Sequence, residues 1–90
     1  MKVQDQLKEL ETVAEKKQIR VSYEAIGGEL GMGGLCKVKG QYRVIVDKRA
    51  TDGDKVNVLA QALAQFSLDD VFMSEEIRAL IARSAQKPRS

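Results

Sequence analysis

Apolar residues recur with helical spacing near the start of the chain. Four of them are separated by four, three and four positions: Val3, Leu7, Leu10 and Ala14. This spacing places them on one face of an amphipathic helix over about residues 2–17. Over residues 19–25, apolar and polar positions alternate instead, which is typical of a half-buried strand. The pattern therefore predicts a helix followed by a strand.

Residues 35–38 and 41–47 have the composition of two strands that form a β-hairpin. A three-residue loop over residues 38–40 places Gly40 at the third position, which favours a left-handed backbone. This register pairs Cys36 with Tyr42. It gathers four side chains on a face that can be buried: Cys36, Tyr42, Val44 and Val46. The other strand residues share the opposite face: Lys37, Arg43, Asp47, Leu35 and Ile45. We therefore expect Cys36 to be a packed, unreactive thiol.

Two further helices are predicted in the second half of the chain. Thr51 or Asp52 can cap the first, since Asp54 follows three residues after Thr51. The buried stripe of this helix includes Val56, Leu59, Ala60 and Leu63. Residues 67–73 connect it to the next helix, and three of their side chains are expected to be anchored in the core: Leu68, Val71 and Phe72. Ser74 can cap the last helix, whose inward face holds Ile77, Leu80 and Ile81.

The predicted order is helix, strand, strand, strand, helix, helix. We expect an α+β fold in which a three-stranded, mainly antiparallel sheet packs on the helices. Residues 1–83 form a single domain, and residues 84–90 form a flexible C-terminal tail. A chain of 90 residues has a small core. Self-association as a homodimer therefore stays open.

The composition restricts the chemistry of the chain. It contains no His and one Cys, so the commonest catalytic base and metal ligand are absent and no intrachain disulfide can form. Four carboxylates have no EF-hand spacing: Asp69, Asp70, Glu75 and Glu76. We expect no catalytic residue, no metal and no cofactor. With neither a long apolar run nor an export signal, the expectation is a cytoplasmic protein without a membrane partner.

The net charge of +2 conceals a concentration of positive charge in the hairpin. Between residues 37 and 49, five cations stand against Asp47: Lys37, Lys39, Arg43, Lys48 and Arg49. A β-ribbon with cations on its open face can contact phosphates, so nucleic acid is a candidate partner. Lys and Arg on an edge strand also prevent sheets from aggregating, which is the simpler explanation.

Residues 27–34 contain five of the seven glycines and are predicted to form a loop. Their spacing fits neither a P-loop nor a dinucleotide-binding turn. The segment Gly28–Gly31 matches the G-x-x-G of an RNA-binding KH domain as a bare pattern, although it follows a strand and carries Glu29. We expect a connector that can offer three contacts to a protein partner: Glu29, Leu30 and Met32.

Two segments carry family resemblances. Residues 60–66, AQALAQF, resemble the A-H-E-L-G-H-F helix of zincin metallopeptidases of the ImmA/IrrE-like type. Gln61 and Gln65 stand where that family has zinc-binding histidines, and Ala62 stands where it has the general base. The resemblance therefore implies a metal-free, inactive relative. Residues 33–40, GGLCKVKG, are similar to a segment of short bacterial proteins of uncharacterised function, which implies no particular activity.

Together these observations favour a non-catalytic, cytoplasmic protein-binding or regulatory module whose partner is another protein or a second copy. Nucleic-acid binding through residues 37–49 is the first alternative. An inactive relative of a zinc peptidase domain is the second.

Overall fold

The computed structural model describes residues 1–26 and 33–86. Within them the element order is α-β-β-β-α-α, which confirms the α+β class. The helices are α1 (Val3–Lys16), α2 (Asp52–Leu63) and α3 (Glu75–Gln86). The strands are β1 (Arg20–Glu24), β2 (Gly33–Val38) and β3 (Gln41–Asp47). Helix α3 reaches three residues into the segment expected to be a tail, and residues 87–90 lie outside the described residues.

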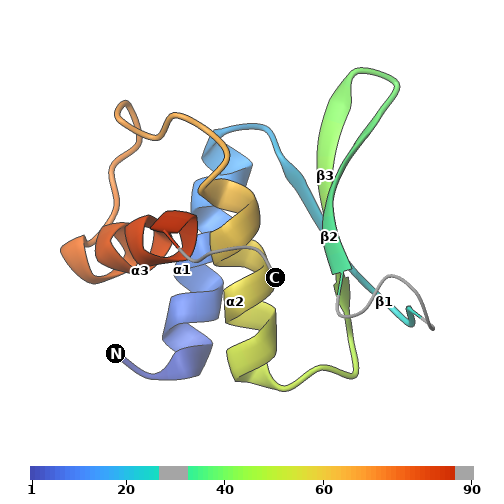
Figure 1. The fold of residues 1–90 in the computed structure, drawn as a ribbon, viewed down its shortest axis with the longest axis horizontal. Helices are drawn as coiled ribbons and strands as arrows, with labels where there is room; N and C mark the ends of the chain where they lie inside the picture. The colour runs from blue at the N-terminus through green and yellow to red at the C-terminus, as the bar shows by residue number, and fades with distance from the viewer. Residues whose placement is uncertain (27–32, 87–90) are drawn as a thin grey trace.

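The elements form layers, as Figure 1 shows. Helices α1 and α2 lie side by side against one face of the sheet, and α3 packs on the side of this pair that is remote from the sheet. No helix of the described residues covers the opposite face of the sheet. In the same part of the chain, no helix has the length and apolar character needed to cross a membrane.

The strand order is β1-β3-β2, so β3 is the central strand. It pairs antiparallel with β2, as the predicted hairpin requires, and parallel with β1. The sheet is therefore mixed. Both outer strands, β1 and β2, are edge strands among the described residues.

The hairpin turn contains two residues instead of the predicted three. Lys39 and Gly40 both have positive φ, 52° and 81°, and Val38 pairs with Gln41. A two-residue turn with two positive φ angles matches the right-handed twist of the strands that it joins. This match outweighs the cost of placing Lys39 in a conformation that favours Gly or Asn.

The shorter turn moves β2 by one residue against β3, so the predicted pairing of Cys36 with Tyr42 is wrong. Cys36 pairs with Arg43 and Lys37 with Tyr42. Because side chains alternate between the faces of a strand, Leu35 and Lys37 share the Tyr42 face, which is the face toward the helices. Cys36 lies on the open face and is partly exposed, so it is not the buried thiol that the predicted register implied.

One hydrophobic core joins the sheet and the helices. Its most deeply buried large side chains come from α1, β3, α2 and α3: Leu10, Val13, Val44, Val46, Leu59, Leu63 and Ile77. Burying such a side chain contributes about 1.5–3 kcal/mol. The predicted caps are confirmed, because the Asp54 N–H donates to Thr51 Oγ1 at 3.1 Å and the Ile77 N–H donates to Ser74 Oγ at 3.3 Å.

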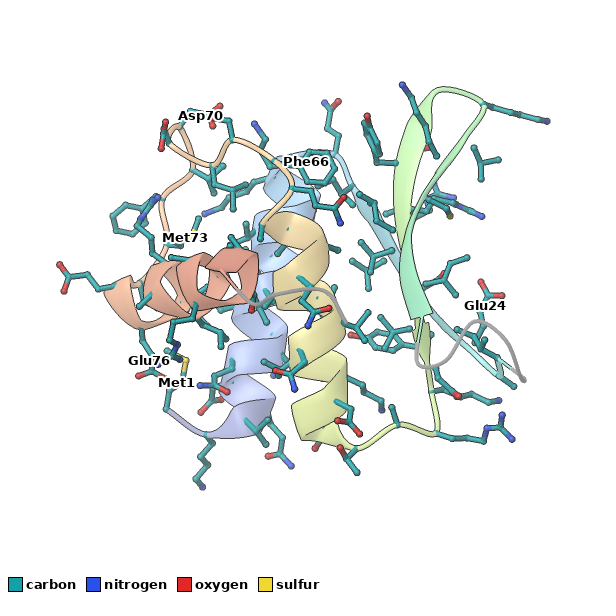
Figure 2. The ribbon with its side chains drawn as sticks, viewed as in Figure 1. Met1, Glu24, Phe66, Asp70, Met73 and Glu76 are labelled. Atoms are coloured by element: carbon teal, nitrogen blue, oxygen red, sulfur yellow. The ribbon has the colours of Figure 1, made fainter. Side chains whose placement is uncertain are left out.

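The connector between α2 and α3 differs from the prediction at one residue. Leu68 and Val71 are buried as expected, but Phe72 is 88% exposed and Met73 takes the inward position. The Lys16 ammonium donates to the Phe72 carbonyl at 3.2 Å. This bond holds the backbone of residue 72 against α1, and the aromatic ring is exposed. Figure 2 shows Met73 between the connector and α3.

Candidate functional site

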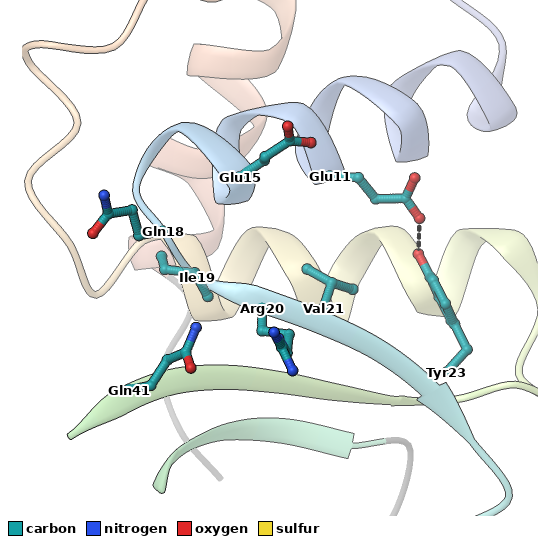
Figure 3. Close-up of a pocket in the computed structure, with 8 residues that line it drawn as sticks. All are labelled: Glu11, Glu15, Gln18, Ile19, Arg20, Val21, Tyr23 and Gln41. Carbon is teal, nitrogen blue, oxygen red and sulfur yellow. Dashed lines mark hydrogen bonds between the residues drawn. The ribbon is translucent and has the colours of Figure 1, made fainter. Parts of the chain in front are cut away.

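A groove of about 470 Å³ runs between α1 and β1 (Figure 3). Residues of α1 form the helix wall, and the rest of the lining comes from the turn after α1, from β1 and from the first residue of β3. The lining residues are Glu11, Glu15, Gln18, Ile19, Arg20, Val21, Tyr23 and Gln41. The sequence predictions named none of these as site residues, because an outward-facing Glu on an amphipathic helix has the same pattern whether or not it lines a groove.

The turn after α1 determines how β1 lies beside the helix. The Ile19 N–H donates to the Ala14 carbonyl at 2.8 Å, and the Gln18 N–H donates to the Glu15 carbonyl at 2.9 Å. These two bonds form a Schellman motif in which Gln18 has a left-handed φ of 60°. The motif reverses the chain at once, so β1 runs back along α1 and the two elements enclose the groove (Figure 3).

The helix wall of the groove carries two carboxylates, Glu11 and Glu15. Glu11 accepts a hydrogen bond from the Tyr23 hydroxyl, which joins α1 to β1. Burial, this hydrogen bond and the negative charge of Glu11 raise the pKa of Tyr23 far above its ordinary value, and Asp52 adds to the effect. Tyr23 therefore stays a neutral donor at physiological pH. Glu15 is exposed, and its carboxylate is in none of the ion pairs of the described residues.

The free edge of β1 forms part of the groove. The Glu24 carbonyl accepts from the Lys48 N–H at 3.0 Å, so the backbone polar groups of Glu24 point toward β3. In a parallel pair, the N–H and C=O of one residue point the same way and the direction alternates along the strand. The backbone N–H and C=O groups of Val21 and Tyr23 therefore point away from β3, at the free edge of the sheet. Among the described residues, nothing outside the sheet bonds to them.

A second groove, of about 280 Å³, lies at the opposite edge, between β2 and the end of α2. Its lining residues are Gly33, Gly34, Leu35, Val58, Gln61, Ala62 and Gln65. The two residues that replace zinc ligands in the zincin resemblance, Gln61 and Gln65, are thus brought together beside a strand edge. Their carboxamides can donate and accept hydrogen bonds, but they are poor zinc ligands.

The five cations of the hairpin region do not lie on one face. Lys37 lies on the helix-facing side, where its ammonium is 5.0 Å from the Tyr42 ring centroid, and Arg43 lies on the open side. Lys39 is in the turn, whereas Lys48 and Arg49 follow the other end of β3. Arg49 is held there, because it donates to the Ile26 carbonyl at 2.8 Å.

The predicted partner loop and the carboxylates weighed as cation ligands are not among the residues that line the β1 groove. Glu29, Leu30 and Met32 fall outside the described residues. Asp70, which Figure 2 labels, lies in the connector between α2 and α3, and its carboxylate is 3.4 Å from the Lys17 ammonium. Among the described residues, no group of three or more His, Cys, Asp or Glu side chains has the arrangement of a metal site.

Comparison of the chain with family models, with curated proteins and with solved structures finds no match. The resemblance to zincin metallopeptidases, and the resemblance to short bacterial proteins over residues 33–40, both stay predictions. Any functional proposal therefore depends on the geometry of the chain itself.

Proposed function

We propose that the protein is a non-catalytic, cytoplasmic protein-binding module that takes an extended segment of a partner protein at the edge of β1. The observation that carries the proposal is the position of the outward N–H and C=O groups of Val21 and Tyr23 along a groove. A segment added as a strand would pair with these groups and place alternate side chains in the groove.

The arrangement supplies two kinds of contact. Ile19 and Val21 contribute apolar side chains to the lining of the groove, while Gln18 and Gln41 contribute polar ones. The four outward backbone groups contribute roughly 2–6 kcal/mol if each hydrogen bond contributes about 0.5–1.5 kcal/mol. Because association costs at least a similar amount, side chains in the groove must supply the net affinity and the choice of partner.

Nucleic-acid binding through residues 37–49 has weaker geometric support. A ribbon that follows a phosphate backbone needs its cations on one surface. Here Lys37 and Arg43 lie on opposite faces of the sheet, and Arg49 lies at the far end of β3. Nucleic-acid binding therefore stays an alternative, but these cations do not form the single basic surface that would favour it.

Amide hydrogen exchange measured by NMR tests strand addition residue by residue. In the free protein, the amides of Ser22 and Glu24 point toward β3 and exchange slowly, whereas those of Val21 and Tyr23 exchange fast. The probes are blocked heptapeptides of alternating Thr and Val and of alternating Thr and Lys. Binding of such a peptide slows exchange at Val21 and Tyr23.

The other edge of the sheet provides the control. Next to the two-residue turn, the bonded pairs of the hairpin are Val38 with Gln41 and Cys36 with Arg43, so the amides of Leu35 and Lys37 point outward. They keep their fast exchange when a peptide binds at β1. Protection of Leu35 and Lys37 instead, or of neither edge by any peptide, contradicts the proposal.

A further inference from the structure

We infer that the segment bound at β1 carries Lys or Arg at two positions separated by one residue, so that its two cations meet Glu11 and Glu15. This inference rests on the proposed function and adds the chemistry of the partner. It follows from the spacing of the two carboxylates, from their charge and from the positions of Arg20 and Glu24.

The spacing of the carboxylates matches that of a strand. Glu11 and Glu15 are four residues apart on a helix, which is about 6 Å along its axis. Side chains two residues apart on one face of a strand are separated by about 6.6–6.8 Å. In Figure 3, α1 lies along β1 with Glu11 opposite Tyr23 and Glu15 nearer the start of β1. Two alternate side chains of an added strand therefore lie opposite the two carboxylates.

The direction of the added side chains follows from the register. The residues of β1 that point their backbone groups outward, Val21 and Tyr23, have side chains on the helix side of the sheet. Directly paired residues of neighbouring strands share a face. Ligand residues paired with Val21 and Tyr23 therefore direct their side chains toward α1, where the carboxylates lie.

Neither carboxylate of the helix wall is in an ion pair of the described residues. Those ion pairs join Met1 with Glu76, Lys17 with Asp70 and Arg49 with Asp47, and none involves the groove. The Tyr23 hydroxyl donates a hydrogen bond to Oε2 of Glu11 and carries no charge. Two like charges one helical turn apart repel each other, and a bound cation removes that repulsion.

Arg20 and Glu24 set the surroundings of the ligand residue between the two cations. By alternation along β1, both side chains belong to the open face of the sheet, on either side of Ser22. A ligand side chain that points away from α1 lies between these two opposite charges, so a cation there gains no net attraction. The groove therefore favours two basic residues separated by one residue at which positive charge gives no advantage.

Three blocked heptapeptides test this pattern. The first is Thr-Thr-Lys-Thr-Lys-Thr-Thr. The second, Thr-Thr-Lys-Lys-Thr-Thr-Thr, has the same composition but adjacent lysines. The third is the first with Gln in place of both Lys. Calorimetric titration at low salt is expected to give the first peptide an affinity about fivefold above each of the others. The preference weakens when salt is raised, because the charges are partly exposed.

The variant Glu15→Gln is expected to bind the first peptide about fivefold more weakly and to lose the preference for alternate lysines. Glu75→Gln is the matched control, since Glu75 is exposed in the first turn of α3 and lies outside the groove. It keeps both the affinity and the preference. Circular dichroism and thermal unfolding show whether each variant retains the fold.

The outcomes separate the inference from the proposed function. If peptides protect the Val21 and Tyr23 amides but bind equally whatever their charge or spacing, the inference is wrong and strand addition stands. If no peptide protects these amides, the proposed function is wrong as well. If the amides are already protected in the free protein and sedimentation shows a dimer, a second copy occupies the edge, and the basic-segment inference is overturned.

Discussion

The two edges of the sheet are built alike, but the polar side chains beside them differ in charge. Each edge strand lies beside a groove lined by two polar side chains that are four residues apart in the sequence. At β1 these are the carboxylates of Glu11 and Glu15, and at β2 they are the carboxamides of Gln61 and Gln65. Backbone geometry leaves polar groups free at both edges, so we expect the charge of the neighbouring side chains to decide which strand each edge prefers.

The β2 edge lies close against β3 at Gly33, and the largest expected effect of a substitution is there. At φ 120°, a Cβ on Gly33 would lie 1.9 Å from the Ile45 carbonyl oxygen, whereas a Cβ on Gly34 meets nothing within 4 Å. Gly33→Ala is expected to reduce the free energy of unfolding by about 3 kcal/mol or more. Urea unfolding of both variants checks the comparison. Equal effects of Gly33→Ala and Gly34→Ala would show that β2 is held loosely.

Tyr23 is the residue that attaches the β1 edge to α1. Tyr23→Phe removes the hydrogen bond to Glu11 and is expected to lower the free energy of unfolding by about 1 kcal/mol. The pKa of Tyr23 is raised by burial and by Glu11, so the folded state holds this proton more tightly than the unfolded state. The stability from Tyr23 is therefore present below pH 10 and is lost as the pH rises further.

Urea unfolding at a series of pH values measures this contribution as the difference between the wild type and Tyr23→Phe. The difference is expected to be constant through neutral pH and to shrink above pH 10. A difference that stays constant into strong alkali contradicts the proposed role of the hydroxyl group.

The negative charge of the β1 groove can be reproduced at the β2 edge. The double substitution Gln61→Glu and Gln65→Glu places two carboxylates in the β2 groove, four residues apart in the sequence as in the β1 groove. It is expected to raise the affinity of β2 for the alternating Thr and Lys peptide about fivefold. Amide exchange at Leu35 and Lys37 reports binding at this edge. If the peptide still protects Val21 and Tyr23 alone, spacing and charge do not suffice to define the partner.

The smallest effect concerns the residue before β1. Gln18 has a left-handed φ of 60°, a conformation that favours glycine. Gln18→Gly is expected to raise the free energy of unfolding by about 0.5 kcal/mol, because glycine removes the steric strain and its greater flexibility offsets part of the gain. Lys39→Asn is the corresponding change in the hairpin turn. Thermal unfolding measures both, and a loss of stability in Gln18→Gly would contradict the Schellman geometry.

The sequence predicted the elements more accurately than their arrangement. Helical spacing identified α1 and α2 because one face of each is apolar and buried, and Thr51 was recognisable as a cap. Alternation shows which residues of a strand share a face, but it does not show which strand lies beside it. The parallel pairing of β1 with β3 and the one-residue difference in the hairpin therefore appear only in the structure.

The candidate site was less predictable for a related reason. Glu11 and Glu15 read as part of a solvated helix face, and only the sharp turn at Gln18 makes them neighbours of a strand edge. Phe72 was expected inside together with Leu68 and Val71, but it is exposed, because the connector has no periodic pattern that shows the direction of each side chain. Side-chain hydrophobicity predicts burial on average, and the local backbone decides the individual case.

The parallel pairing of β1 with β3 has a consequence for how the chain folds. The hairpin of β2 and β3 closes through two residues, so its contacts form early and locally. Residue Arg20 must instead find Arg43, which is synthesised after the whole of β2. Because this pairing is non-local, we expect β1 to join the sheet after the hairpin has formed. The strand that we propose as the binding edge is thus also the strand that we expect to join the sheet last.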